Sequence, residues 1–262
     1  MKKERILYYS DLANDDFSKV DFNSKPLPDS YEYNPKNPFR RAFDWFLYYG
    51  FASWVARLYS FFNFRQKVVN RKVVKPYKRK GYFIYGNHTR MGGDAFTPGI
   101  VTWPDKAAII TNNDSASNGP IRFFTKSLGS MPLPSSLRGF KSFHIAMKER
   151  LDKGQPITIY PEAHIWPYYT KIRPFKDASF HYPVEFNRPI FTFTTTYQKR
   201  RYSKRPKVVV YVDGPFLPKE DLKPKENQKY LRDICYSTMV ERSKNSNYEY
   251  IKYIYKEKEN NN

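Results

Sequence analysis

The chain has 262 residues, enough to bury a substantial core as one large domain or two small ones. Its formal net charge of +21 at pH 7 indicates an anionic partner, which can be nucleic acid, a membrane or a phosphorylated substrate. A lone cysteine, Cys235, excludes an internal disulfide and a cysteine-based metal site. The stretch MKKERILYYSDLANDD has no apolar segment after its basic residues, so we expect no secretory signal and a cytosolic chain.

Residues 1–36 mix charged residues, Asn, Ser and Pro with scattered aromatics, and we expect an irregular extension draped on the rest of the chain. Asn37 and Pro38 then form a pair typical of a helix N-cap and first helical position. From Trp45 to Ala56 only Ser53 is clearly polar. As a helix this run spans roughly 18 Å, short of the roughly 30 Å hydrocarbon core. It therefore predicts a buried core helix or a helix in the membrane interface.

A basic run follows the aromatic one. Between Arg65 and Lys80 there are eight basic residues and no acidic residue. Close to an anionic leaflet each could contribute about 1 kcal/mol, although a solvated charged segment is the alternative interpretation. Because an aromatic helix directly precedes the run, we expect residues 37–80 to dock on the cytoplasmic face of an anionic membrane as a peripheral or monotopic segment.

Residues 81–262 alternate between short apolar runs and helical patterns. The apolar runs predict strands at 82–85, 107–110, 157–160, 190–196 and 207–212. The helical patterns lie at 139–152, which Lys153-Gly154 should end, and at 175–186 and 225–243. This alternation predicts an α/β fold with a mixed, largely parallel sheet covered by helices, preceded by the aromatic membrane-interface helix.

Polar residues follow two of the predicted strands. The segment GNHTRMGGD carries His88 and Asp94, and the segment ITIYPEAHIWP carries Glu162. Ligands usually bind where strands of an open α/β sheet end, and a histidine there can deprotonate a hydroxyl if a carboxylate holds its other nitrogen. In the segment KIRPFKDASF, Arg173 and Lys176 could hold a phosphate. The alternatives are a solvated loop histidine, a turn-capping glutamate and a basic surface pair.

Together these segments resemble the glycerolipid acyltransferase family, which acylates lysophosphatidate or glycerol 3-phosphate. The likeness covers about residues 75–215. The family has an Asn-His-x4-Asp motif, a Phe-Pro-Glu-Gly-Thr-Arg motif and a Pro-Phe-Lys segment, each after a strand. The matching residues are Asn87 and His88, then Pro161 and Glu162, then Pro174, Phe175, Lys176 and Ala178.

The resemblance implies an O-acyltransferase that uses acyl-CoA or acyl carrier protein as co-substrate, with no metal, cofactor or acyl-enzyme. The acceptor would be a lysophospholipid or glycerol phosphate. In this interpretation His88 is the base and Asp94 orients its ring. Asn87 and backbone N–H groups near Gly92-Gly93 would stabilise the oxyanion, and Glu162 would hold the acceptor's polar head.

Two differences from the family pattern concern the loop and the acceptor. Five residues separate His88 from Asp94 instead of four, which the paired glycines could absorb as a bulged turn, and Ala163-His164-Ile165 replaces Gly-Thr-Arg. The family's remaining block, expected near KSLGSMPLPSSLRGF, retains only Gly129 and a displaced Arg138. The candidate ligands for an acceptor phosphate are therefore Lys126, Arg138, Lys171, Arg173 and Lys176.

Three other functions are open to the sequence. A nucleic-acid-binding protein fits the charge and the aromatics, but the sequence has no basic-aromatic repeat, zinc spacing or recognition-helix pattern, so no nucleic acid is expected. A divergent lipid-binding member without turnover fits the longer His–Asp spacing. Metal-dependent hydrolysis lacks any His-x3-His type of spacing among the four histidines, so no metal is expected.

Overall fold

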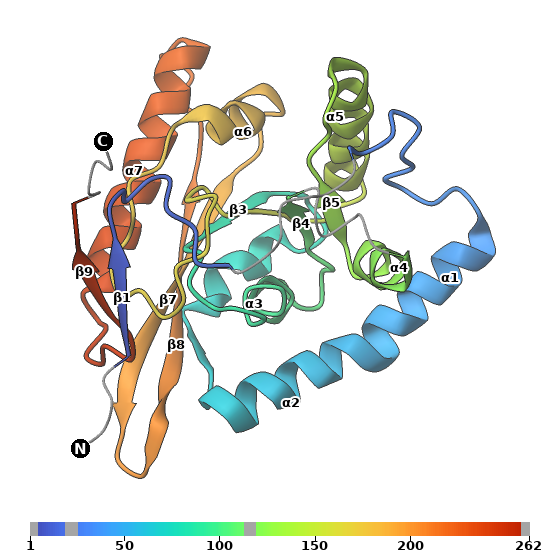
Figure 1. Cartoon of the computed structure of the whole chain (residues 1–262). Coiled ribbons are helices and arrows are strands. Elements are labelled where there is room, and N and C mark those ends of the chain that lie inside the picture. Colours follow the sequence, from blue (N-terminus) through green and yellow to red (C-terminus); the bar gives the residue numbers. More distant parts are fainter. Residues whose placement is uncertain (1–4, 19–25, 113–118, 258–262) are drawn as a thin grey trace, which may run out of the picture.

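The computed structural model describes residues 5–18, 26–112 and 119–257. This part of the chain holds a seven-stranded sheet in the order β2-β8-β7-β3-β6-β4-β5, in which only β7 and β8 run antiparallel (Figure 1). The strands are β2 (Lys67–Val69), β3 (Phe83–Gly86), β4 (Ala108–Thr111), β5 (Ser130–Pro132), β6 (Ile157–Ile159), β7 (Ile190–Arg200) and β8 (Ser203–Phe216). The predicted mixed, largely parallel α/β sheet is confirmed.

Helices cover both faces of this sheet, and alternate residues of each strand point to opposite faces. On one face Phe83 and Tyr85 of β3 belong to a core with α5 and α7. On the other face Tyr82 and Ile84 belong to a core with the end of α2 and with α3. The helices are α1 (Pro38–Phe46), α2 (Ser53–Phe64), α3 (Thr97–Thr102), α4 (Gly119–Ser127), α5 (Leu137–Asp152), α6 (His181–Glu185) and α7 (Pro224–Ser243), with 3₁₀ turns at Arg71–Tyr77 and Ala178–Phe180.

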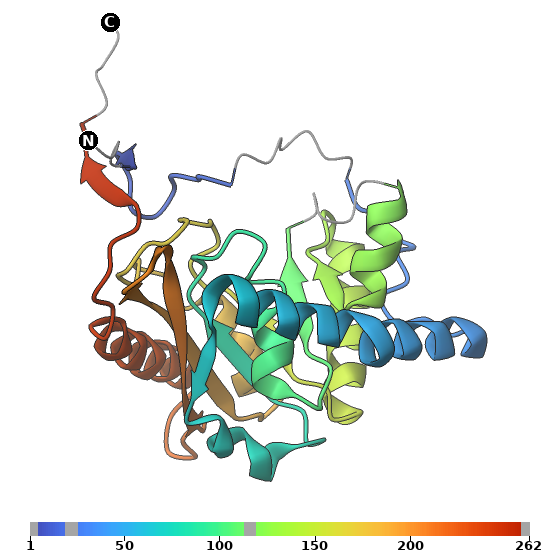
Figure 2. The ribbon, with the colours of Figure 1, turned by 90° about the horizontal axis from the view of Figure 1, so that it is seen from below.

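The predicted aromatic helix forms a long rod along one side of the protein (Figures 1 and 2). A π-helical segment, Leu47–Ala52, joins α1 to α2 without a break. Asn37 is the N-cap, as expected: its Oδ1 accepts the backbone N–H of Phe39 at 2.8 Å and of Arg40 at 3.3 Å.

The outer face of this rod is apolar and exposed. Its exposed large side chains are Phe39, Phe43, Trp45, Phe46, Phe51, Trp54, Leu58, Phe61 and Phe62. Two other residues, Ala56 and Phe64, point inward and are buried. In the described part of the chain no helix has both the length and the apolar character to cross a bilayer. The rod therefore exposes aromatic side chains on its solvent side and packs its opposite side against the protein.

Several short elements had no sequence prediction. Strand β2 lies inside the basic run and pairs with β8, so the sheet takes a strand from within residues 37–80. Among the described residues, β1 (Ile6–Tyr9) and β9 (Lys252–Tyr255) form a separate two-stranded parallel sheet. The N-terminal extension is thus partly regular, because it pairs with a strand from the far end of the chain.

An aromatic cluster anchors the N-terminal segment over the loop that follows β6. The Trp166 ring lies 5.0 Å from Tyr9, 5.1 Å from Phe17 and 5.0 Å from Tyr253, measured between ring centroids. The Trp166 indole N–H also donates to the Asp15 carbonyl at 2.7 Å. Residues 5–18 therefore cover the loop that carries Glu162.

Candidate active site

The loop that carries His88 begins where β3 meets β7. Gly86 is required there, because a Cβ on this residue would lie 2.0 Å from Cζ of Phe193. Asn87 is buried, and its amide donates to the Thr195 carbonyl at 3.0 Å and accepts the Thr195 N–H at 2.7 Å. Asn87 thus joins two strands and does not line the cavity. The contact with substrate that was expected of Asn87 stays a prediction, and the structure places its amide between strands.

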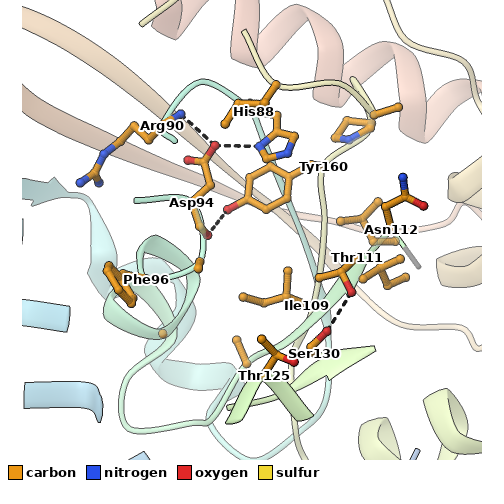
Figure 3. Close-up of a pocket in the computed structure, with 18 of the residues that line it drawn as sticks. His88, Arg90, Asp94, Phe96, Ile109, Thr111, Asn112, Thr125, Ser130 and Tyr160 are labelled. Atoms are coloured by element: carbon orange, nitrogen blue, oxygen red, sulfur yellow. Dashed lines mark hydrogen bonds and ion pairs between the residues drawn. The ribbon is translucent and has the colours of Figure 1, made fainter. Parts of the chain in front are cut away.

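The loop places His88 and Asp94 against each other, as Figure 3 shows. The distance from His88 Nδ1 to Asp94 Oδ2 is 2.8 Å, and the same carboxylate oxygen accepts the Arg90 N–H at 2.9 Å. The Asp94 side chain is 5% exposed and the His88 side chain 25% exposed. A carboxylate on Nδ1 selects the tautomer in which Nε2 is an acceptor. This is the arrangement that a general base requires.

The longer His–Asp spacing is accommodated by a turn that starts at Arg90. The Arg90 carbonyl accepts the N–H groups of Gly93 at 3.0 Å and of Asp94 at 2.9 Å. Gly92 adopts a positive φ of 73°. A Cβ on Gly93 would lie 2.5 Å from Nε of Arg90, so the Arg90 side chain passes directly over this glycine. The paired glycines therefore absorb the added residue and still bring Asp94 to the ring.

Tyr160 supports the pair and was not among the predicted site residues. Its ring stacks on His88 with centroids 4.5 Å apart, and its hydroxyl donates to the Asp94 backbone carbonyl at 2.6 Å (Figure 3). Burial raises the pKa of Tyr160 well above its ordinary value, so the hydroxyl stays a donor. The sequence signal was the tyrosine that replaces the family's phenylalanine before Pro-Glu.

Glu162 is buried beneath the loop, where it supports His88 from behind. Its Oε2 accepts the His88 backbone N–H at 3.0 Å, and its Oε1 accepts the Arg173 N–H at 2.9 Å. The Arg173 Nη2 lies 3.5 Å from Oε2 and donates to the Glu162 carbonyl at 3.2 Å and to the His164 carbonyl. Burial raises the pKa of Glu162, and the guanidinium and the two N–H donors oppose that rise.

Glu162 and Arg173 therefore form a buried pair in the structure, and their expected contacts with the acceptor stay a prediction. The Arg173 side chain is 1% exposed, and neither residue lines the cavity. The physical reason is that the polar groups of this pair bind the backbone of two loops, the loop after β3 and the loop after β6.

Only one of the predicted phosphate ligands lies at the cavity. Lys176 is exposed and lines the cavity. The Nζ of Lys126 lies 3.5 Å from Glu32, away from the cavity lining. Arg138 and Lys171 are exposed and lie outside the lining. The phosphate contact expected of Lys126, Arg138 and Lys171 therefore stays a prediction that the cavity lining does not support.

A cavity of about 1040 Å³ opens beside His88. It is as large as the upper end of ordinary ligand pockets, about 300–1,000 Å³. It extends between the aromatic rod and the sheet, and its apolar lining includes Ala52, Ala56, Ile100, Ile109, Leu128 and Leu133. Because Ala52 and Ala56 of the rod have small side chains, they leave space for the cavity beside the rod. The sequence pattern did not predict this space. The described residues contain no group of three His, Cys, Asp or Glu placed to hold a metal ion.

The structure is that of an α/β protein with a His–Asp pair at the carboxyl end of its sheet and an apolar cavity beside it. No protein-family model and no curated protein matches the chain. The structure is similar to the crystal structure of the 1-acyl-sn-glycerophosphate (LPA) acyltransferase PlsC from Thermotoga maritima, with a TM-score of 0.52. The match covers 80% of this chain and 97% of that chain at 17% sequence identity. The resemblance to glycerolipid acyltransferases is thereby confirmed as a shared fold.

Proposed function

We propose that the protein is an O-acyltransferase that moves a fatty acyl group from a thioester donor, acyl-CoA or acyl carrier protein, to a lipid hydroxyl. The observation that carries this proposal is the 2.8 Å contact between His88 and Asp94 at the mouth of an apolar cavity of about 1040 Å³. The fold shared with PlsC supports the same chemistry. The acceptor we propose is a lysophospholipid or glycerol phosphate.

In this mechanism His88 acts as a general base. Its Nε2 removes the proton of the acceptor hydroxyl while the oxygen attacks the thioester carbonyl carbon. The tetrahedral intermediate then expels the thiolate, and the thiolate takes this proton from the imidazolium. Asp94 stabilises the imidazolium through Nδ1, and general-base assistance of this kind contributes about 10²–10⁴ in rate.

The oxyanion and the acceptor head would meet different groups. The Asn87 amide is already bonded to Thr195, so we propose backbone N–H groups at Met91 and Gly92, which line the cavity, for the oxyanion. Lys176 is the predicted phosphate ligand that lies at the cavity, and we propose that it contacts the acceptor head.

We also propose that the protein docks peripherally on the cytoplasmic face of an anionic membrane through the rod and the basic run that follows it. The outer face of the rod exposes aromatic side chains such as Trp45 and Trp54, which suit headgroup depth. The inner face of the same rod contributes Ala52 and Ala56 to the cavity. A lipid chain would then reach the cavity beside the helix that touches the bilayer.

The decisive experiment compares wild type with His88→Ala and Asp94→Asn, using labelled acyl-CoA and lysophosphatidate in mixed micelles. Each substitution should lower turnover at least about 100-fold. The matched control is His144→Ala, since this exposed histidine pairs with Glu185 outside the cavity and should retain full activity.

Three outcomes separate the alternatives. Near-normal turnover by His88→Ala would refute the base. Saturable binding of acyl-CoA or lysolipid by a wild-type protein that shows no turnover would identify a non-catalytic lipid-binding member. A screen of glycerol phosphate and several lysophospholipids with one labelled donor then identifies the acceptor.

A further inference from the structure

The β7–β8 hairpin carries a second group of basic residues, which adjoins the start of the run at residues 65–80 because β2 pairs with β8. No acidic residue occurs between Glu185 and Asp213. We define the hairpin tip as residues 199–205, KRRYSKR. Its exposed side chains are Lys199, Arg201, Tyr202, Lys204 and Arg205. Such a concentration of one charge sign at a turn repels itself unless it faces an anionic partner.

The hairpin tip is fixed to the C-terminal end of the aromatic rod. Arg200 Nη1 donates to the Asn63 carbonyl at 3.2 Å, and Arg205 Nη1 donates to the Asn63 Oδ1 at 2.6 Å. Asn63 lies in the last turn of α2, beside the exposed rings of Phe61 and Phe62. Figure 1 shows the long hairpin extending beyond the sheet on the side where α2 ends. The basic tip and the aromatic face are therefore neighbours.

The charges of the tip are not neutralised within the described part of the protein. There, no ion pair involves Lys199, Arg201, Lys204 or Arg205. Tyr202 at the turn is 86% exposed. An amphipathic ring among cations, next to a row of exposed aromatic side chains, fits lipid headgroups above an apolar layer.

We propose that the hairpin tip is a second lipid-binding element, which holds anionic headgroups of the membrane on which the rod docks. This inference rests on the docking part of the proposed function and adds the class of lipid and the part of the chain that selects it. Two contacts, the rod along its length and the tip at its end, would fix the rotation of the protein on the bilayer. An anionic bilayer is favoured over nucleic acid because the outer face of the rod beside the tip exposes aromatic side chains such as Phe61 and Phe62.

The test uses the full chain with Arg201→Gln/Lys204→Gln. The matched control is Lys225→Gln/Lys229→Gln, which removes the same two charges from the first turns of α7. The far end of α7 leads to Asn247, which bonds to Tyr197 and Lys199, so the two control residues lie about 20–27 Å along the helix from the end that adjoins the hairpin. Vesicle flotation is measured with phosphatidylcholine alone and with added phosphatidylglycerol.

The hairpin variant should bind the anionic vesicles about 30-fold more weakly than wild type, since each cation contributes about 1 kcal/mol at such a surface. The control variant should bind like wild type, and binding to the neutral vesicles should not differ among the three proteins. Turnover in detergent micelles should be unchanged in both variants, because the tip lies outside the cavity.

The experiment distinguishes failure of the docking proposal from failure of the inference about the hairpin tip. If wild type floats with neither vesicle, the docking proposal fails and this inference fails with it, while acyl transfer in micelles still stands. If wild type floats with the anionic vesicles and the hairpin variant floats equally well, only this inference is overturned. Loss of single-stranded oligonucleotide binding in the hairpin variant, with vesicle binding intact, would overturn it in favour of nucleic acid.

Discussion

Replacing Glu162 with glutamine should destabilise the fold rather than weaken substrate binding. The carboxylate accepts one backbone N–H from His88 and one from Arg173, and it faces the Arg173 guanidinium at 3.5 Å. A glutamine amide keeps one acceptor oxygen, but its NH₂ group would meet a backbone donor. The substitution also leaves the buried guanidinium without a counter-charge.

The structure sets the size of the effect. Removing one partner of a buried ion pair costs about 3–5 kcal/mol, and losing a hydrogen bond to a charged acceptor accounts for about 1.5–3 kcal/mol of this. At about 2–4 °C per kcal/mol in chains of this size, the Tm should fall by roughly 6–20 °C. The double variant Glu162→Gln/Arg173→Met should be more stable than the sum of its single variants predicts.

The assay combines thermal unfolding, followed by circular dichroism, with kinetics at varied lysophosphatidate. The control is Glu185→Gln, because that carboxylate is half-exposed beside His144 and should change stability by less than about 0.5–1 kcal/mol. If Glu162→Gln kept the wild-type Tm and raised only the KM for the acceptor, Glu162 would be a substrate contact and the structural role would be wrong.

Two further predictions concern a pair of glycines and a partly buried lysine. Gly86→Ala should cost at least about 2 kcal/mol in urea unfolding, because its Cβ would lie 2.0 Å from the Phe193 ring. Gly92→Ala should cost only about 1 kcal/mol for its positive φ, because its Cβ meets no atom within 4 Å, and equal costs would contradict this reasoning. Burial lowers the pKa of Lys106 from 10.5 to about 8. Between these two pH values the lysine is therefore protonated in the unfolded chain and mostly neutral in the folded chain. The unfolding free energy of wild type relative to Lys106→Met should therefore rise with pH over that interval, by up to about 1.4 kcal/mol per pH unit, and a flat difference would show that the lysine is not buried in solution.

The main strands were predictable because a parallel strand covered on both faces reads as an unbroken apolar run. The runs at 82–85 and 157–160 became β3 and β6 for this reason. Strands β2 and β5 have three residues each, which is too short for an alternating or apolar pattern to be recognised. They are strands because they pair with β8 and β4. Strands β1 and β9 come from opposite ends of the chain, so no local signal predicts their pairing.

The sequence indicated the candidate site at residues whose side chains suit acid–base chemistry, a histidine and a carboxylate. The sequence located His88 and Asp94, and the structure brings them to 2.8 Å. It did not distinguish a polar side chain that faces a cavity from one that faces the interior, because adjacent residues at a strand end point in opposite directions. Asn87 therefore turns inward to Thr195 while His88 turns outward. Glu162 likewise faces the interior, and its expected contact with the acceptor stays a prediction.

The turn between His88 and Asp94 connects the site to the aromatic rod. Arg90 reaches from this turn to the end of α2, where its Nη1 bonds to Gln66 at 2.5 Å and its guanidinium lies 4.6 Å from the centre of the Phe64 ring. The Arg90 side chain can pass over Gly93 because this residue has no Cβ. The helix that presents the proposed docking surface is therefore also the support of the loop that carries His88 and Asp94, and a wall of the cavity. If the proposed acyl transfer takes place, a lipid that leaves the bilayer along that wall would reach the imidazole without crossing bulk water, and exclusion of water would limit hydrolysis of the thioester.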